Sequence, residues 1–150
     1  MIVDTSALVA IIRGEPDRRA YQALIAQAPA ARISAGTYVE LGIVVDGPRD
    51  PVQSSSLDTL LASARIRIEP FTASQAQIAR TAYERFGRGS GHPARLNMGD
   101  CFAYALAREL GEPLLFKGRD FALTDIELVT EPIRHRRLSE IIAAYGVGVP

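Results

Sequence analysis

The sequence predicts a single α/β domain with a mostly parallel central sheet, and three observations lead to this fold class. The chain has 150 residues, which suits one domain and is too short for two of ordinary size. Short apolar stretches alternate with longer segments of helical spacing, the order expected when helices connect parallel strands. The composition, 47% hydrophobic and 23% charged, is that of a soluble globular domain and excludes a disordered, collagen-like or coiled-coil chain.

The individual elements follow from local patterns along the chain. Residues 1–3 are apolar on both faces of a strand, and Asp4 then offers a side chain that caps helices. Residues 7–12 are apolar all round, so a helix there must be covered on more than one side, which suggests a partner or a second protomer. Residues 65–69 alternate strictly, as in a half-exposed strand. Strands are expected at 1–3, 32–34, 65–69, 113–116 and 126–129, helices at 7–12, 16–28, 37–45, 51–64, 72–86 and 99–110, and one long loop at 87–97.

Four acids that lie far apart in the sequence form the candidate functional group: Asp4, Glu40, Asp100 and Asp120. Asp4 and Asp120 each follow an expected strand at its carboxyl end, where ligands bind in sheets of this class. Glu40 and Asp100 lie on helix faces of apolar or small residues, with no Lys or Arg three or four positions away, where an ionised group is costly unless something pairs with it. Each acid alone also has an ordinary explanation as a helix cap, a first-turn acid, a solvated helix position or a turn residue.

Carboxylates that converge without cationic partners repel one another, and a bound divalent cation resolves the conflict. Ligand sets made only of oxygen favour Mg²⁺ or Mn²⁺ over zinc. A hard cation in a carboxylate pocket lowers the pKa of a water and stabilises charge on phosphate oxygens, which is the chemistry of phosphodiester hydrolysis.

The segments around these acids resemble the PIN-domain ribonucleases, and among them the VapC-type toxins of bacterial toxin–antitoxin pairs. MIVDTSALVAII is similar to the first strand and acid of that family, and SAGTYVELGIVV to its second acidic segment. HPARLNMGDCFAYALA, followed by EPLLFKGRDFALTDI, is similar to its most recognisable stretch. The resemblance runs from Met1 to about Val129 and implies a three-layer α/β/α fold, with a PIN domain over 1–130. Residues 131–150 remain as an addition, expected to form a helical extension packed on the same domain.

The resemblance implies roles for individual residues. The four acids match the catalytic and metal-binding carboxylates, for Mg²⁺ or Mn²⁺. Thr5 or Ser6 matches the hydroxyl residue beside the first acid, and Asn97 matches the residue before the third. Asp125 lies in the TDI ending of the family and is not placed among the ligands. Candidate contacts to substrate are Arg88 and Arg95 in the loop 87–97, which also carries His92, and Lys117 and Arg119 after the fourth expected strand.

The expected function is that of a cytoplasmic, metal-dependent endoribonuclease, the toxin of a toxin–antitoxin pair, acting on structured RNA such as tRNA. Similar proteins are homodimers inhibited by a cognate VapB-type antitoxin, and operator DNA is expected to be reached only through that antitoxin. The charge is balanced at 17 cationic and 17 acidic residues, so contact with RNA is expected to be local. No membrane contact is expected, because no apolar run approaches the ~18 residues that cross a bilayer.

Two other functions remain open from the residues. A catalytically silent interaction domain would use the apolar helices at 7–12 and 37–45 for dimerisation and antitoxin binding, but the presence of all four acids weighs against it. A phosphoryl-transfer receiver or phosphatase usually has a second acid close to the first-strand aspartate, whereas Thr5 and Ser6 occupy those positions here. The single cysteine, Cys101, excludes an internal disulfide, and no Cys/His cluster suggests zinc.

Overall fold

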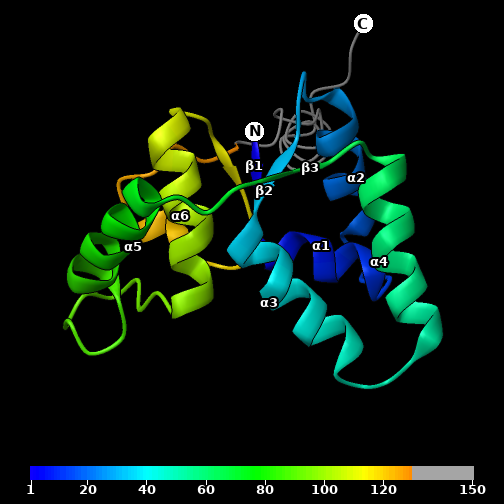
Figure 1. Ribbon diagram of the computed structural model, residues 1–150. Helices are drawn as coiled ribbons and strands as arrows, with labels where there is room; N and C mark the ends of the chain where they lie inside the picture. The colour runs from blue at the N-terminus through cyan, green and yellow to red at the C-terminus, as the bar shows by residue number, and fades with distance from the viewer. Residues whose placement is uncertain (130–150) are drawn as a thin grey trace, which may run out of the picture.

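The computed structural model in Figure 1 describes residues 1–129, which form a single sheet flanked by helices. All four strands are parallel, in the order β3-β2-β1-β4, so the predicted parallel sheet is confirmed. β1 lies centrally, because its Ile2 pairs with both β2 and β4. The strands are β1 (Ile2–Val3), β2 (Arg32–Ser34), β3 (Arg67–Glu69) and β4 (Leu114–Leu115).

The helices begin where the sequence provides capping side chains. The helices are α1 (Thr5–Ile12), α2 (Arg18–Gln27), α3 (Ala35–Asp46), α4 (Pro51–Ser63), α5 (Ala73–Phe86) and α6 (Met98–Leu110), with a 3₁₀ turn at Phe121–Leu123. Five of them start behind an acid, amide or hydroxyl that accepts from a first-turn N–H: Asp4, Ser34, Asp50, Thr72 and Asn97. Gly111 ends α6 with a φ of +61°, which favours glycine. None of the helices in this part of the chain has the length and apolarity to cross a bilayer.

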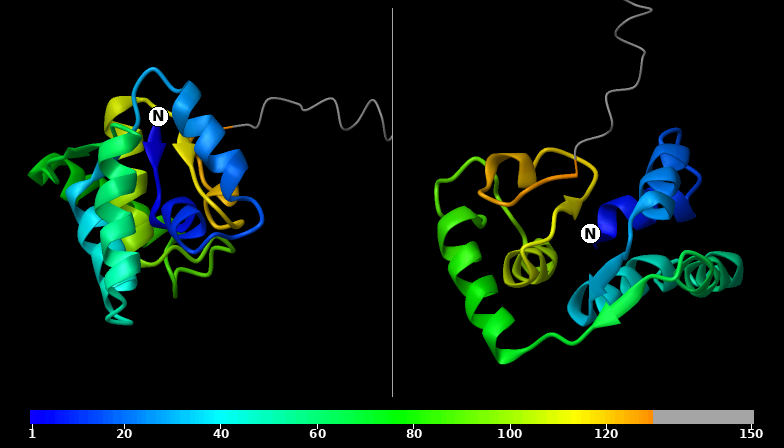
Figure 2. Two further views of the ribbon diagram at one scale, coloured as in Figure 1. Left: turned by 90° about the vertical axis from the view of Figure 1, so that its right-hand side faces the viewer. Right: turned by 90° about the horizontal axis from the view of Figure 1, so that it is seen from above.

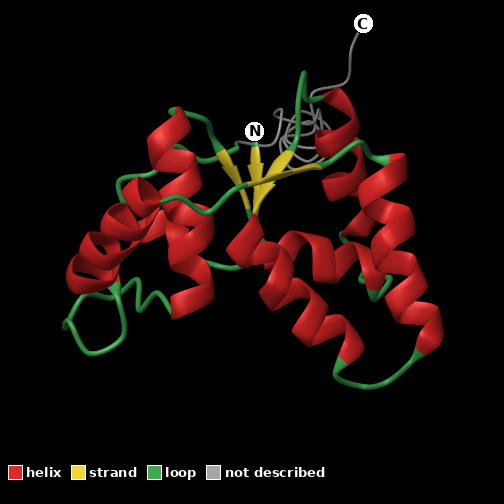
Figure 3. Ribbon diagram, in the orientation of Figure 1, coloured by secondary structure: helices red, strands yellow, loops and turns green. Residues whose placement is uncertain are grey.

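The helices cover the two faces of the sheet in separate groups (Figures 1 to 3). α5 and α6 lie on one side, and α1, α2, α3 and α4 lie on the other. The strands send alternate side chains into the two cores: Ile2 and Leu114 into the first, and Val3 and Leu115 into the second. This is the expected three-layer arrangement, and it leaves the carboxyl ends of β1, β2 and β4 leading directly into α1, α3 and the turn before Phe121.

Helices of the same chain bury α1. α1 packs against α2, α3 and α4, which bury Ala7, Leu8, Ala10 and Ile11. The suggestion that residues 7–12 need a second protomer to cover them is therefore unnecessary. The predicted extension at 131–150 lies outside the described residues.

Two predicted strands differ from the structure. Residues 126–129 form only an isolated bridge, Leu128 with Leu114, because β4 is two residues long and offers no longer partner. β3 begins at Arg67 rather than Arg65, whose positive φ of 51° still belongs to the turn after α4. β3 is an edge strand, so Ile68 is 45% exposed although the alternation placed it on the buried side.

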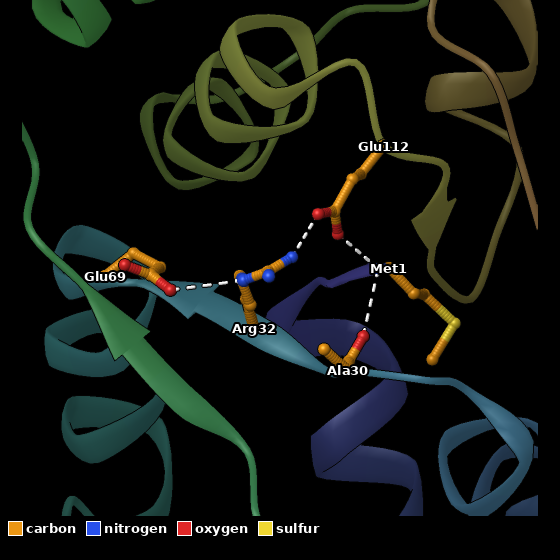
Figure 4. Close-up of polar contacts among 5 residues, drawn as sticks. All are labelled: Met1, Ala30, Arg32, Glu69 and Glu112. Carbon is orange, nitrogen blue, oxygen red and sulfur yellow. Dashed lines mark hydrogen bonds and ion pairs between the residues drawn. The ribbon is translucent and has the colours of Figure 1, made fainter.

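Ion pairs fix the amino-terminal ends of the central strands (Figure 4). The Met1 ammonium donates to the Ala30 carbonyl at 3.0 Å and pairs with the Glu112 carboxylate. Arg32 at the start of β2 pairs with the same carboxylate and, through Nε at 3.2 Å, with Glu69. Every acid in this cluster therefore has a cation.

Candidate active site

Asp4 is the most buried of the four predicted acids, with 4% of its surface exposed. It lies where β1 ends, and its Oδ2 accepts from the Ser6 N–H at 2.9 Å and the Ser6 hydroxyl at 2.6 Å. Its Oδ1 is buried and has no hydrogen-bond partner. Burial raises the pKa of Asp4 above its ordinary value against the effect of the Ser6 bonds, and the charge of Glu40 raises it further.

Ser6 links Asp4 to the neighbouring strand. Its Oγ accepts from the backbone N–H of Lys117, just after β4, at 2.9 Å while donating to Asp4. One hydroxyl therefore couples the ends of β1 and β4 and fixes the rotamer of the Asp4 carboxylate.

Glu40 reaches the start of α1 from the middle of α3. Thr5 Oγ1 donates to Glu40 Oε2 at 2.6 Å. The same carboxylate lies against Gly99 at the start of α6, so closely that a Cβ on Gly99 would be 1.9 Å from Oε1. Glu40 therefore joins the first turns of two helices.

Asp100 is oriented by a reciprocal cap at the start of α6. The Asn97 N–H donates to Asp100 Oδ2 at 2.6 Å, and the Asp100 N–H donates to Asn97 Oδ1 at 3.0 Å. Burial raises the pKa of Asp100 to about 7 against the effect of the Asn97 N–H, and the charges of Asp4, Asp120 and Glu40 add to the rise. A carboxyl group whose pKa is raised in this way by burial and neighbouring charges marks a candidate functional site.

Asp120 lies on the exposed turn after β4, next to the 3₁₀ turn. Its charge acts on Asp100, so it belongs to the same electrostatic neighbourhood. Within residues 1–129, none of the four acids takes part in an ion pair. The fold thus brings together four carboxylates from separate elements and supplies no cation for them.

The chemistry of this group fits a hard divalent cation. All its donors are oxygens, and the buried Asp4 Oδ1 lacks the partner that such an atom normally has. No three His, Cys, Asp or Glu side chains of the described chain stand close enough together to form a finished ligand set. The carboxylates are near enough to influence one another's ionisation but are not closed around a common point.

Asp125 has its own hydrogen-bond and ion-pair partners, separate from the four acids. It accepts from the Tyr104 hydroxyl at 2.6 Å and pairs with Arg85 at 3.2 Å. The bond from Tyr104 lowers the pKa of Asp125, whereas the pKa values of Asp4 and Asp100 are raised. Asp125 therefore joins α5 and α6 to the last described segment.

The cations predicted to contact substrate fall into two groups. The Lys117 ammonium pairs with Glu15 and, at 2.9 Å, with Asp17, so it is already engaged. Arg88, Arg95 and Arg119 are exposed and form no ion pair with the described chain. His92 caps its own loop, because its Nδ1 accepts from the Ala94 N–H at 3.2 Å and its ring packs edge-on against Phe86.

Sequence reasoning missed Gly99, on which the Glu40 carboxylate rests. A signal was available, because a glycine inside a helix costs about 1 kcal/mol relative to alanine and usually has a packing or functional reason. Its neighbour Asp100 was identified, but the partner of Gly99 lies 59 positions away and is visible only in the fold.

Comparison with known proteins places this chain in a family. The family model described as PIN domain matches residues 1–127, and the chain belongs to the PIN-domain family. Ribonuclease VapC28 of Mycobacterium tuberculosis is 55% identical over 127 residues, which cover 85% of this chain and 96% of that protein. Ribonuclease VapC of Mycolicibacterium smegmatis is 44% identical over 129 residues, 86% of this chain and 99% of that protein. The resemblance drawn from the sequence is confirmed.

Solved structures confirm the fold. Mycobacterium tuberculosis VapC20, described as a sarcin-ricin loop cleaving toxin, superposes with a TM-score of 0.68 at 19% identity, covering 87% of this chain and 98% of that one. A toxin–antitoxin complex from Klebsiella pneumoniae gives 0.60 at 22% identity, covering 81% of this chain and 89% of that one. At these identities the likeness concerns the fold.

Proposed function

We propose that this protein is a metal-dependent endoribonuclease and the toxin of a toxin–antitoxin pair. The observation that carries the proposal is the group of four carboxylates without a cation, in which the buried Asp4 Oδ1 has no partner. Membership of the PIN-domain family and the VapC ribonucleases among its relatives support it.

Asp4, Glu40, Asp100 and Asp120 would hold Mg²⁺ or Mn²⁺. When bound, such an ion supplies Lewis acidity at a phosphodiester oxygen and activates water for hydrolysis. Ser6 fixes Asp4, Thr5 orients Glu40, and Asn97 holds Asp100 in the first turn of α6. Because these partners set the rotamers of three acids before substrate arrives, less reorganisation remains for the bound state.

The substrate proposed is structured RNA such as tRNA, which the exposed cations Arg88, Arg95 and Arg119 would contact through phosphates. Lys117 belongs to this set only if RNA displaces Glu15 and Asp17 from its ammonium. Each phosphate contact made by an arginine releases counterions, so RNA affinity is expected to fall as salt rises. A flat response to salt would remove this role from the arginines.

The partners proposed are a second copy of the chain and a VapB-type antitoxin, with operator DNA reached only through the antitoxin and the complex residing in the cytoplasm. On α3, Val39 and Ile43 lie one turn apart and are 59% and 69% exposed, an apolar face suited to a second copy. A groove of about 580 Å³ lies between α1, α2 and α4, away from the acids, and has apolar lining from Ile12, Val52 and Leu60 that suits a segment of antitoxin.

The direct test is to incubate the purified full chain with total RNA and to map the cleavage ends. We expect site-specific ends with Mg²⁺ or Mn²⁺, none in EDTA, and recovery when the metal is restored. Intact RNA under all three conditions would favour the catalytically silent interaction domain. Mapped ends would also show whether the target is tRNA or another structured RNA.

A further inference from the structure

α3 and α6 meet through two reciprocal notches, each made by a glycine. On α3, Gly36 receives the Phe102 ring of α6, and a Cβ at position 36 would be 2.5 Å from it. On α6, Gly99 receives the Glu40 carboxylate of α3, and a Cβ at position 99 would be 1.9 Å from Oε1. Because Gly36 and Glu40 are four residues apart and Gly99 and Phe102 three, each helix presents one notch and one projecting side chain on the same face.

The side chains that fill the two notches differ in how easily they can move. The Phe102 ring is held edge-on by Phe71, with ring centroids 4.8 Å apart, so it has little room to give way. The Glu40 carboxylate is the end of a flexible chain, and one hydrogen bond from Thr5 orients it. A methyl group at position 36 therefore strains the packing of the helices, whereas one at position 99 first displaces the Glu40 carboxylate.

We infer that Gly99 is a positioning residue for Glu40, an inference that rests on the proposed function. The missing side chain at position 99 lets the Glu40 carboxylate lie against the first turn of α6, beside Asp100 and within reach of Thr5. A Cβ there occupies the space of both oxygens, which it would approach to 1.9 and 2.5 Å. The carboxylate must then move, which disturbs its hydrogen bond from Thr5 and its position relative to Asp100.

Stability of the helix gives no reason for glycine at this position. Alanine is the better helix former, by about 1 kcal/mol in a helix interior. The three atoms nearest to a methyl group there all belong to the Glu40 carboxyl group, so the requirement for glycine comes first from the site.

The test is Gly99→Ala in the full chain, measured by Mn²⁺ titration, RNA cleavage and thermal unfolding. We expect Mn²⁺ to bind about 10-fold more weakly, as is typical when the support of a ligand is lost. Cleavage at fixed Mn²⁺ is expected to fall by about the same factor, with a melting temperature within about 3 °C of the wild type. Gly42→Ala on α3 is the matched control, because its Cβ would meet only Asp46 Oδ2 at 3.8 Å. It should leave Mn²⁺ affinity unchanged.

A double-mutant cycle that combines Gly99→Ala with Glu40→Ala shows whether Gly99 acts through Glu40. If it does, Gly99→Ala added to Glu40→Ala weakens Mn²⁺ binding no further, and any loss of melting temperature in Gly99→Ala is recovered in the double variant. An additive loss, no recovery, or wild-type Mn²⁺ affinity in Gly99→Ala overturns the inference while leaving the proposed nuclease in place. If instead Glu40→Ala itself binds Mn²⁺ as the wild type does, the assignment of the metal site is wrong.

Discussion

The carboxylates at the two ends of the central sheet have opposite electrostatic environments. At the amino end, Glu112 is bound by the Met1 ammonium and Arg32, and Arg32 also pairs with Glu69 (Figure 4). Burial there acts to raise the pKa of Glu112, but the ammonium and guanidinium outweigh it and lower that pKa. At the carboxyl end, the pKa values of Asp4 and Asp100 are both raised by burial and by neighbouring acids.

This difference separates the acids that stabilise the fold from the acids proposed to hold a metal ion. At the amino end every carboxylate has a cation, so removing one member of these ion pairs is expected to lower the folding stability. The carboxyl end retains mutual repulsion that a bound cation would relieve. Stability and function are therefore expected to separate when each end is altered.

The largest effect is expected from Asp4→Asn at the carboxyl end. RNA cleavage should fall by at least about 100-fold, because the variant loses the charge of the most buried proposed ligand. The amide oxygen can still accept from Ser6, so the melting temperature in EDTA should not drop. Asp58→Asn, an exposed acid on α4, is the control and should cut normally. Cleavage at the wild-type rate by Asp4→Asn would disprove the site.

The matching change at the amino end is Glu112→Ala. It leaves Arg32 one partner short and the ammonium of Met1, whose side chain is only 7% exposed, without its counter-charge. We expect a loss of about 2 kcal/mol in the free energy of unfolding, measured with urea. Mn²⁺ affinity should be unchanged, and Glu84→Ala, an exposed acid on α5, should leave stability unchanged. A change in Mn²⁺ affinity would show that the two ends are coupled.

A smaller effect is expected from Asp100→Asn in the metal-free protein. The folded pKa of Asp100, about 7, lies above the unfolded value of 3.8, so its neutral form supports the fold and this support is lost as pH rises from 3.8 through 7. The variant stays neutral, so at pH 8 it should be more stable than the wild type by about 1–2 kcal/mol, after allowance for solvent screening at a half-buried group.

Melting temperatures in EDTA between pH 5.5 and 8.5 test this sign. The gap between Asp100→Asn and the wild type should already reach about half of its full size at pH 5.5, widen up to about pH 7 and stay constant above that pH. A variant that is less stable at pH 8 would mean that Asp100 is stabilised by its charge, as Glu112 is, and the contrast between the two ends would fail.

The smallest effect is expected from Lys117→Met, at the rim of the site. The hydrogen bonds that the Lys117 ammonium donates to Glu15 and Asp17 raise the pKa of Lys117 and occupy the ammonium. Cleavage should change by less than about 2-fold, since the backbone N–H that holds Ser6 is retained. The comparison variant is Arg119→Met, which removes an exposed cation from the same turn. A loss for Lys117→Met larger than that for Arg119→Met would return Lys117 to the substrate contacts.

Most of the element order could be read from the sequence, because it depends on local patterns. Strand β2 was predicted with its observed bounds, and α4, α5 and α6 to within one residue at either end. The predictions failed where pairing between distant segments decides the outcome. Residues 126–129 have the composition of a strand, but β4 is too short to pair with them beyond Leu128.

Asp4 and Asp120 could be selected from the sequence because each follows an expected strand, and Glu40 and Asp100 because their helix faces carry no cation. The resemblance to the PIN-domain ribonucleases joined these four acids into one predicted site. Their proximity required the parallel sheet to bring the ends of β1 and β4 together and to set α3 against α6. Lys117 shows the opposite case. It follows β4 directly, yet its ammonium turns to Glu15 and Asp17, a pairing across about 100 positions that no local pattern reports.

The sequence by itself determined which residue types are present, where helices start and stop, and that several acids lack cations among their sequence neighbours. These are short-range properties, set by side-chain chemistry and backbone preference within a few residues. The tertiary structure alone decided that α1 is covered by helices of its own chain. It also decided that Asp125 binds Tyr104 and Arg85, and that the Glu40 carboxylate packs against Gly99. The physical reason is that charge, burial and steric contact act through space, and folding brings together atoms that the sequence holds far apart.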